Sequence, residues 1–499
     1  MLDTPIDNHQ GKISRPAIID IGSNSVRLVI YENFSPAVNI FYNEKFSCKL
    51  GCFTKEGTLS DKSKEKTIQA IQRFKKICDA NHVTTITAIA TAAMRDAHDG
   101  PEFAELLSAK TGITIKVISG DQEAYYAAMG VAHKIPYAIG AVGDLGGGSL
   151  ELAIINQKKV GHQRISLPLG VLRIQNETQE IFNIKTYAHY IDTVLDGAEF
   201  DNQNQKNFYC VGGSWRALMR CYIHIHDVPL HVLQGFKVSA QDVVIFLEKI
   251  ITDKIDYDYK DFSPHISKRR FAMLPVAALL LLKLIKKFKF ETLIVSIAGL
   301  REGAVVDSLP HNPDDYASSS VAFAFSESQM RARNPLLYPY FIRAIQQILP
   351  NLTPKFMIFV QIMTYLSDVA FRRHSDYRAQ YVFDFILYAN LDDLTHTQRV
   401  LIASVIAWRY DPDFMVPKKL FLLLKKHDDY VHNGRTIALA LRYLYSVTGI
   451  SHLVAKDLEL IRHPTFIEQK NLSHNDATLL PSGETTQKRF NALQKHLFA

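Results

Sequence analysis

The sequence has few cysteines and no long apolar run, and each shortage excludes a class of protein. Cys48 and Cys52 are close, but no second pair completes a zinc site among the five cysteines. An odd count without a disulfide framework fits a reducing compartment, so we expect a cytoplasmic protein. The longest apolar stretch, residues 271–285, is short for a bilayer and contains Pro275 and Lys283. It predicts a buried helix, and the polar first sixteen residues have no apolar signal core.

The bulk composition is that of a large globular protein. The chain has 499 residues, of which 47% are hydrophobic and 21% charged, and this length predicts roughly three domains. The net charge is +7 and the isoelectric point is about 8.9. This mild positive excess favours a polyanionic partner, although ordinary solubility charge would give the same number.

A run of three glycines stands between two apolar segments in DLGGGSLEL, residues 144–152. Both flanks are typical of strands, so the pattern predicts a β-hairpin with a glycine turn. Successive N–H groups in such a turn form a concavity that binds anions. Asp144 and Glu151 at its two ends could approach a hard cation, the usual companion of a phosphate. The alternative is an ordinary glycine hairpin without a ligand.

A second copy of this unit lies near the N-terminus. The segment AIIDIGSNSVRLVIYEN aligns with AVGDLGGGSLELAIINQ, so that Asp20 matches Asp144 and Ser25 matches Ser149. A repeated supersecondary unit predicts two similar α/β lobes that face each other across a cleft. Arg27 stands where the second copy has Glu151, so the first lobe would offer a cation and the second a carboxylate.

Helical and strand patterns alternate up to about residue 310, which indicates α/β lobes. HNPDD at His311–Asp315 is typical of a linker, and the glycine-poor sequence after it predicts a mostly helical domain. We expect a first lobe at residues 1–130, a second lobe at 131–311 and a helical domain at 312–499. The last domain should end in short strands and a polar helix after about residue 450.

Six motifs in register carry a family resemblance. DIGSNS, ATAAMRDA, ISGDQEA, DLGGGSLEL, VGGSWRA and GLREG occur in this order. They resemble the bacterial exopolyphosphatase and guanosine pentaphosphate phosphatase family of the actin-like superfamily. The resemblance implies an α/β fold of two ribonuclease H-like lobes with a phosphate-binding cleft, followed by a C-terminal helical HD-like domain. It covers residues 16 to about 310 well and the helical domain more loosely.

The resemblance also implies an activity. The family removes the terminal phosphate of inorganic polyphosphate with Mg²⁺, and a monovalent cation such as K⁺ is a further candidate cofactor. The alternatives are hydrolysis of the 5′ γ-phosphate of guanosine pentaphosphate in the same cleft, and sensing of polyphosphate or of guanosine penta- or tetraphosphate without turnover. A sugar or acetate kinase fits the motif order poorly. We expect a homodimer, no membrane partner and no specific nucleic acid.

The motifs assign a role to each candidate site residue. The resemblance makes Glu123 the base that accepts a proton from the attacking water. Asp144 and Glu151, with Asp20, would hold Mg²⁺. The phosphate would be bound by both turns and two arginines, namely Gly22, Ser23, Asn24, Ser25, Arg27, Arg95, Gly146, Gly147, Gly148 and Ser149.

Several of these residues have simpler interpretations. Glu123 would suit the first turn of a helix, where its charge complements the helix dipole. Arg95 could be a solvated loop residue, and Arg27 could pair with a carboxylate between the lobes. Arg301 and Glu302 could form a structural ion pair. Trp215 could fill the space that adenosine occupies in the superfamily.

The helical domain departs from the HD pattern. Ser367 stands where a metal-binding histidine would be needed beside Asp368, which predicts no second metal site. Arg372, Arg373 and Arg378 could guide a polyanion or lie on a solvated helix face.

Overall fold

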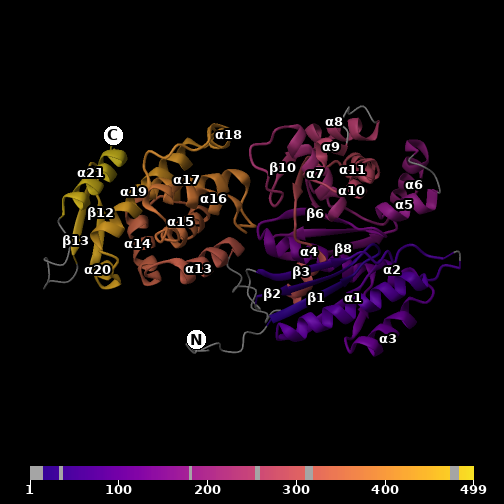
Figure 1. Cartoon of the computed structure of the whole chain (residues 1–499). Helices are drawn as coiled ribbons and strands as arrows, with labels where there is room; N and C mark the ends of the chain where they lie inside the picture. The colour runs from indigo at the N-terminus through magenta and orange to yellow at the C-terminus, as the bar shows by residue number, and fades with distance from the viewer. Residues whose placement is uncertain are drawn as a thin grey trace. The chain divides into compact units, whose positions relative to one another are not determined.

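The computed structural model describes residues 15–32, 38–54, 56–178, 183–252, 259–308, 318–471 and 483–498. The chain forms two compact units, Met1–Pro313 and Asp314–Ala499 (Figure 1). The predicted linker at residues 311–315 and the polar segment up to residue 14 lie outside the described residues. The predicted boundary between the two lobes of the first unit stays a prediction.

The first lobe is a five-stranded sheet with helices packed on it. Its sheet has the order β3-β2-β1-β4-β5, in which β1 pairs antiparallel with β2 and parallel with β4. The strands are β1 (Arg15–Ile21), β2 (Val26–Tyr31), β3 (Ile40–Phe46), β4 (Val83–Ala90) and β5 (Ile115–Val117). The helices are α1 (Asp61–Ala80), α2 (Ala92–Asp96) and α3 (Gly100–Thr111), followed by α4 (Gly120–Lys134), which lies between the two sheets in Figure 1.

The second lobe repeats this topology and extends it by one strand. Its sheet has the order β10-β11-β9-β6-β7-β8, so that β6, β7, β8, β9 and β11 take the places of β1, β2, β3, β4 and β5. The strands are β6 (Ile139–Leu145), β7 (Leu150–Asn156), β8 (Lys159–Leu167), β9 (Asn207–Val211), β10 (Lys237–Ser239) and β11 (Thr292–Val295). The prediction of two similar α/β lobes is therefore confirmed.

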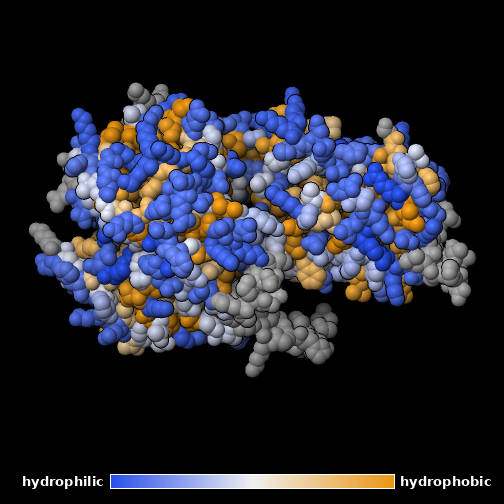
Figure 2. Space-filling model, turned by 180° about the vertical axis from the view of Figure 1, so that it is seen from behind, coloured by the Kyte–Doolittle hydropathy of each residue, from blue (hydrophilic) through white to orange (hydrophobic). Residues whose placement is uncertain are grey.

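Eight helices of the second lobe are described, and the longest carries the apolar run noted in the sequence. They are α5 (Val171–Thr178), α6 (Ile184–Asp196), α7 (Gly213–Ile225), α8 (Ala240–Ile251), α9 (Tyr259–Phe262), α10 (Lys268–Ala272), α11 (Leu274–Phe288) and α12 (Leu300–Asp307). The apolar side chains of α11 are buried in the core of this lobe, as predicted. No helix among the described residues is long and apolar enough to span a membrane. Figure 2 shows hydrophilic residues over most of one face, with apolar residues in small groups.

Two glycines let α4 and α12 meet backbone to backbone. A Cβ added at Gly303 would lie 1.8 Å from the carbonyl oxygen of Tyr126, and one at Gly130 would lie 2.3 Å from that of Gly299. No side chain fits at such a contact. The close crossing fixes the start of α12 against α4, and both helices carry candidate site residues.

The second unit is mostly helical and ends in a small hairpin and a last helix, as predicted. Its helices are α13 (Ser319–Arg331), α14 (Tyr338–Ile348), α15 (Pro354–Leu366), α16 (Arg378–Tyr388), α17 (His396–Tyr410), α18 (Lys418–Phe421), α19 (Asp428–Val447), α20 (His452–Asp457) and α21 (Glu484–Phe498). Its strands are β12 (Leu458–Arg462) and β13 (Ile467–Asn471).

The second unit contains a buried carboxylate that binds two arginines. Asp368 is 1% exposed, and Arg333 binds both of its oxygens, at 3.0 and 2.8 Å. Arg409 donates to the same carboxylate at 3.3 Å. The neighbouring Ser367 pairs with the Tyr445 hydroxyl at 2.8 Å. At the position of the His-Asp pair of the HD pattern, this domain therefore has a cluster of one carboxylate and two guanidinium groups. Among the arginines proposed as a polyanion guide, Arg378 donates to local carbonyls.

Replacing Asp368 by alanine should leave the buried guanidinium of Arg409 without a carboxylate partner. We expect the free energy of unfolding of this unit to fall by about 3–5 kcal/mol. The chain has two tryptophans, one in each unit, so the fluorescence of Trp408 in a Trp215→Phe background reports urea unfolding of the second unit alone. Asp376→Ala, which removes an exposed carboxylate, should change stability by less than about 0.5 kcal/mol. Equal midpoints for the two variants would contradict the prediction.

Candidate functional site

The two predicted hairpins form, and their registers match. In the second, Asp144 on β6 lies directly opposite Glu151 on β7. In the first, Asp20 on β1 lies opposite Arg27 on β2. Each hairpin thus places one carboxylate and one further charged side chain side by side across its two strands. The repeat seen in the sequence therefore corresponds to two hairpins with the same strand register.

The same hydrogen bond closes both turns. The N–H of Gly22 donates to the carbonyl of Ser25 at 3.1 Å, and the N–H of Gly146 donates to that of Ser149 at 3.0 Å. Each bond closes a short loop of two residues. These loops line one pocket.

The carbonyl groups of the turns are engaged on the side away from the pocket. Those of Ser23 and Asn24 accept from the loop that follows β3, at 2.7 and 3.0 Å. Those of Gly146 and Gly147 accept from the start of α5, at 3.3 and 2.9 Å. In the described part of the chain, no acceptor is within hydrogen-bond distance of the N–H groups of Ser23, Asn24, Gly147 and Gly148. Free N–H groups at two facing turns are a ready anion site.

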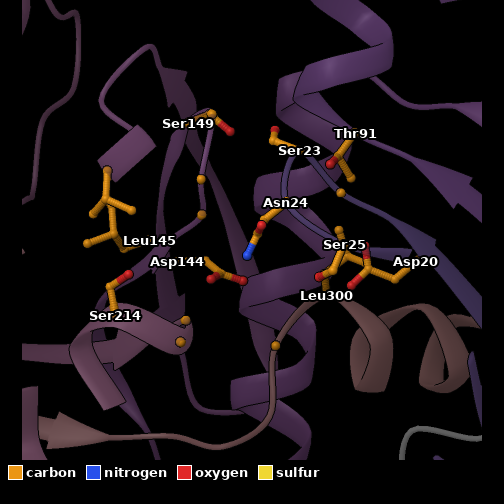
Figure 3. A pocket seen from close by; sticks show the side chains of 18 of the residues that line it. Asp20, Ser23, Asn24, Ser25, Thr91, Asp144, Leu145, Ser149, Ser214 and Leu300 are labelled. Atoms are coloured by element: carbon orange, nitrogen blue, oxygen red, sulfur yellow. The ribbon is translucent and has the colours of Figure 1, made fainter. Parts of the chain in front are cut away.

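The turns approach each other so closely that only glycine fits on one side. A Cβ added at Gly148 would lie 2.7 Å from the hydroxyl oxygen of Ser23 and 3.0 Å from the Cβ of Ala92. Figure 3 shows Ser23 and Ser149 on opposite walls, with the side chain of Asn24 pointing toward Asp144 between them. The pocket encloses about 260 Å³ and is lined by both lobes of the first unit.

Glu123 reaches this pocket from the first turn of α4. The helix begins after Ser119, whose hydroxyl accepts from the N–H of Gln122 at 3.2 Å. Glu123 is 9% exposed, and its Oε2 accepts from Nη1 of Arg95 at 2.9 Å. Burial raises the pKa of Glu123 to about 7, against the opposing effect of Arg95. A carboxylate with that pKa can both hold and accept a proton at neutral pH.

Three further carboxylates share the pocket with Glu123. Burial raises the pKa of Asp144 to about 6 and that of Glu151 well above its usual range, and the charge of each carboxylate adds to the effect on its neighbours. Burial also raises the pKa of Asp20, although Arg301 opposes this. Ser166 donates to Glu151 at 2.8 Å. Burial and mutual repulsion therefore disfavour full ionisation of this cluster, and a bound cation would favour it.

The donor set suits a hard divalent cation. Asp20 and Asp144 face the pocket, and the buried Oδ1 of Asn24 has no hydrogen-bond partner. No group of three metal-binding side chains exists among the described residues. Mg²⁺ keeps several waters and needs only one or two carboxylates plus substrate phosphates, so this sparser set fits it.

Arg95 lies in the short helix α2, so the alternative that it is a solvated loop residue was wrong. It is the one predicted site residue outside the pocket lining, because its guanidinium packs on Glu123. Asp96 beside it lies 3.6 Å from Nε of Arg95 and also pairs with Arg173 on α5. Glu123, Arg95, Asp96 and Arg173 therefore form a continuous chain of ion pairs that reaches α5 of the second lobe.

A wall of cations that the sequence patterns did not predict also lines the pocket. Its members are Lys45, Arg216, Arg269 and Arg270, together with the predicted Arg27. In the described part of the chain none of them lies within ion-pair distance of a carboxylate. The Lys-Arg-Arg run at residues 268–270 was the sequence feature that could have indicated Arg269 and Arg270. Lys45 could not be assigned to the pocket because strand β3, which carries it, was not predicted. Burial and the charge of Arg270 lower the pKa of Lys45.

The interpretations of Arg27 and of the Arg301–Glu302 pair were wrong. Arg27 donates to Asn43 at 2.7 Å, not to a carboxylate. Arg301 pairs with Asp20 at 3.5 Å, while Glu302 accepts from the N–H of Gly299 and so caps α12. Trp215 is fully buried, donates to a carbonyl of α11 and does not line the pocket, and the hypothesis that it fills the space of an adenosine stays a prediction.

Comparison with known proteins gives one family. The model of the Ppx/GppA phosphatase family matches residues 29–312, and the model "Exopolyphosphatase, C-terminal" matches residues 353–471. A bifunctional 3-dehydroquinate synthase/phosphatase of Fusobacterium nucleatum is 28% identical over 52% of this chain and 45% of its own length. Exopolyphosphatase 1 of Mycobacterium tuberculosis is 26% identical over 33% of this chain and 48% of its own length. The chain spans about half the length of these curated relatives.

Solved structures agree with this result. The Aquifex aeolicus member of the Ppx/GppA family has a TM-score of 0.50 and 27% identity, over 60% of this chain and 99% of that one. An exopolyphosphatase from Cytophaga hutchinsonii, with a TM-score of 0.52 and 21% identity over 60% of this chain and 99% of that one, shows the same fold.

Proposed function

Because this chain belongs to the Ppx/GppA phosphatase family, we propose that it hydrolyses the terminal phosphoanhydride bond of inorganic polyphosphate and releases orthophosphate. One observation carries the choice of a polyanionic substrate: one pocket holds free N–H groups, a carboxylate cluster and a wall of cations without carboxylate partners. The positive charges of such a wall repel one another unless a bound anion balances them. The exopolyphosphatase names of several relatives agree with it.

The two turns would bind the terminal phosphate. The N–H groups of Ser23, Asn24, Gly147 and Gly148 approach it from both lobes and donate to its oxygens. Backbone donors are rigid, so they need no reorganisation as charge shifts onto these oxygens. The rest of the chain would then lie along the cation wall.

Glu123 would activate the attacking water. The water oxygen bonds to the terminal phosphorus, the bond from that phosphorus to the bridging oxygen breaks, and Glu123 takes the water's proton. The products are orthophosphate and a chain one phosphate shorter. Arg95 holds the Glu123 carboxylate in place at 2.9 Å.

Asp144 and Asp20 would hold Mg²⁺ at the phosphate, and Glu151, which lies opposite Asp144, would add to the negative charge around it. When bound, Mg²⁺ neutralises phosphate charge and helps to align the leaving oxygen. These carboxylates supply the negative charge that such binding needs.

Guanosine pentaphosphate is the second candidate substrate, and one observation favours it. Gly212 has a positive φ of 96°, and with Gly213 and Ser214 it forms a corner of the pocket from which Trp215 is absent. That corner could accommodate a nucleoside.

The test is phosphate release with Mg²⁺ from long polyphosphate and from guanosine pentaphosphate at equal concentrations of terminal phosphate. We expect faster release from polyphosphate. Faster release from the nucleotide would favour the second candidate. Binding of either compound without release would identify a sensor and refute the proposed hydrolysis.

A further inference from the structure

Two arginines, Arg173 on α5 and Arg95 on α2, share the carboxylate of Asp96. The guanidinium of Arg173 pairs with Oδ2 of Asp96, and Oδ1 of the same carboxylate lies 3.6 Å from Nε of Arg95. Arg95 in turn donates to Oε2 of Glu123 and to the carbonyl of Ile118, at 2.9 and 3.3 Å. Glu123 and Asp96 therefore both attract Arg95, and Arg173 offsets part of the charge of Asp96.

The backbone fixes Arg173 beside the second glycine turn. Its N–H donates to the carbonyl of Gly147 at 3.2 Å, in the first turn of α5. Ala92 at the start of α2 packs on the same turn, because a Cβ at Gly148 would lie 3.0 Å from the Cβ of Ala92. Helices α2 and α5 therefore both contact the turn that would bind the terminal phosphate, and the ion pair with Asp96 joins them across the two lobes.

The four charged side chains are partly shielded from water. The exposed fraction is 29% for Asp96, 22–23% for the two arginines and 12% for Glu123. Charges placed in this way are screened less by water and salt than charges on an open surface. The loss of one charge should therefore act on the others.

Arg95 is the cation that opposes the acidic surroundings of Glu123. Asp144 on β6 and Asp20 on β1 raise the pKa of Glu123, as burial does, whereas Arg95 lowers it. The charge of Glu123 in turn raises the pKa of Glu151 on β7. How far Glu123 is ionised at neutral pH therefore depends on where the guanidinium of Arg95 lies.

We propose that Arg173 is a positioning residue for Glu123 that acts from the opposite lobe, because its hold on Asp96 leaves Arg95 on the Glu123 carboxylate. The inference rests on Glu123 being the base of the proposed hydrolysis. Without Arg173, the full charge of Asp96 would draw Arg95 away from Glu123, and the proton affinity of the base would rise. Without Asp96, the charge of Arg95 would act on Glu123 undivided, and this affinity would fall.

The test compares Arg173→Gln with Asp96→Asn, which break the same ion pair from its two sides. Carboxyl ¹³C NMR of protein labelled at glutamate Cδ gives the pH at which Glu123 is half protonated, and the loss of a signal in Glu123→Gln identifies this residue. We expect this midpoint to rise by about 0.3–0.7 pH unit in Arg173→Gln and to fall by a similar amount in Asp96→Asn. The acid limb of kcat/KM for polyphosphate should move in the same two directions, because it reports the base of the free enzyme.

Two further variants control the comparison. Arg173→Lys keeps the charge and should restore most of the wild-type midpoint. Arg73→Gln is the matched control, because Arg73 pairs with Glu44 at 2.9 Å within the first lobe and does not line the pocket. It should leave both the midpoint and kcat/KM unchanged. Any titration of the substrate is common to all variants and cancels in the comparison.

Three results would overturn the inference. Shifts of the same sign in Arg173→Gln and Asp96→Asn would mean that breaking the pair only loosens the contact between the lobes. Unchanged midpoints in both variants would mean that Arg95 stays on Glu123 without help from the second lobe. A shift of the same size in Arg73→Gln would mean a general effect of net charge. If wild type releases no phosphate, the proposed function fails, and the NMR midpoints then decide the positioning of Glu123 separately.

Discussion

Replacing Glu123 by glutamine should lower kcat for phosphate release by about 10²–10⁴-fold, with KM changed much less. The amide keeps the size of the side chain but cannot accept the proton of the attacking water. Glu123 is held at the pocket by Arg95, and burial raises its pKa to about 7. The rate of wild type should therefore fall as the pH drops below about 7, because the protonated carboxyl cannot act as a base. Steady-state kinetics between pH 5.5 and 9 measure both effects.

Asp121→Asn is a matched control for this prediction. It removes a second acidic residue from the first turn of the same helix, but Asp121 pairs with Arg164 at 2.8 Å and does not line the pocket. If the charge of Glu123 served only to complement the helix dipole, the two variants would behave alike. A Glu123→Gln enzyme with wild-type kcat would refute the proposed base.

The sequence allowed the hairpins and the carboxylate side of the pocket to be predicted, because these depend on local patterns. A strand, glycine turn and strand fix a register over a few residues, and the repeat revealed the second copy. The local pattern therefore predicted, without any knowledge of tertiary contacts, that Asp144 and Glu151 lie close together.

The cation wall depends on contacts between distant segments and could not be predicted in this way. Lys45 lies on β3, whose alternation is weak because most of its residues are exposed. It meets Arg27 through the sheet register, whereas Arg270 comes from a short helix of the other lobe. Arg301 lines the pocket, but the ion pair with Glu302 that its sequence neighbour suggested does not form. Adjacent residues in a helix point in different directions, so Arg301 reaches Asp20 while Glu302 caps the helix.

Asp144→Asn should abolish most activity and at the same time stabilise the first unit at alkaline pH. Burial raises the pKa of Asp144 from 3.8 to about 6, so the folded state holds this proton more tightly than the unfolded chain. The tighter binding of this proton stabilises the folded state below pH 3.8. That contribution of Asp144 to stability is lost as the pH rises through about 6. At pH 8 the ionised group costs at most about 3 kcal/mol, and roughly half that because the pocket is open to water. The neutral amide removes this cost.

Thermal unfolding at pH 8 and pH 5 measures this effect. We expect the melting temperature of the first unit to rise by roughly 2–5 °C in the variant at pH 8 and by less at pH 5, since there the wild-type carboxyl is largely protonated. Mg²⁺ should raise the melting temperature of wild type at pH 8 but that of the variant much less, because a ligand stabilises only the state that binds it. A variant that is less stable at pH 8 would mean that Asp144 serves the fold through hydrogen bonds. A variant stabilised at pH 8 that keeps full activity would show that this carboxylate has no part in holding the cation.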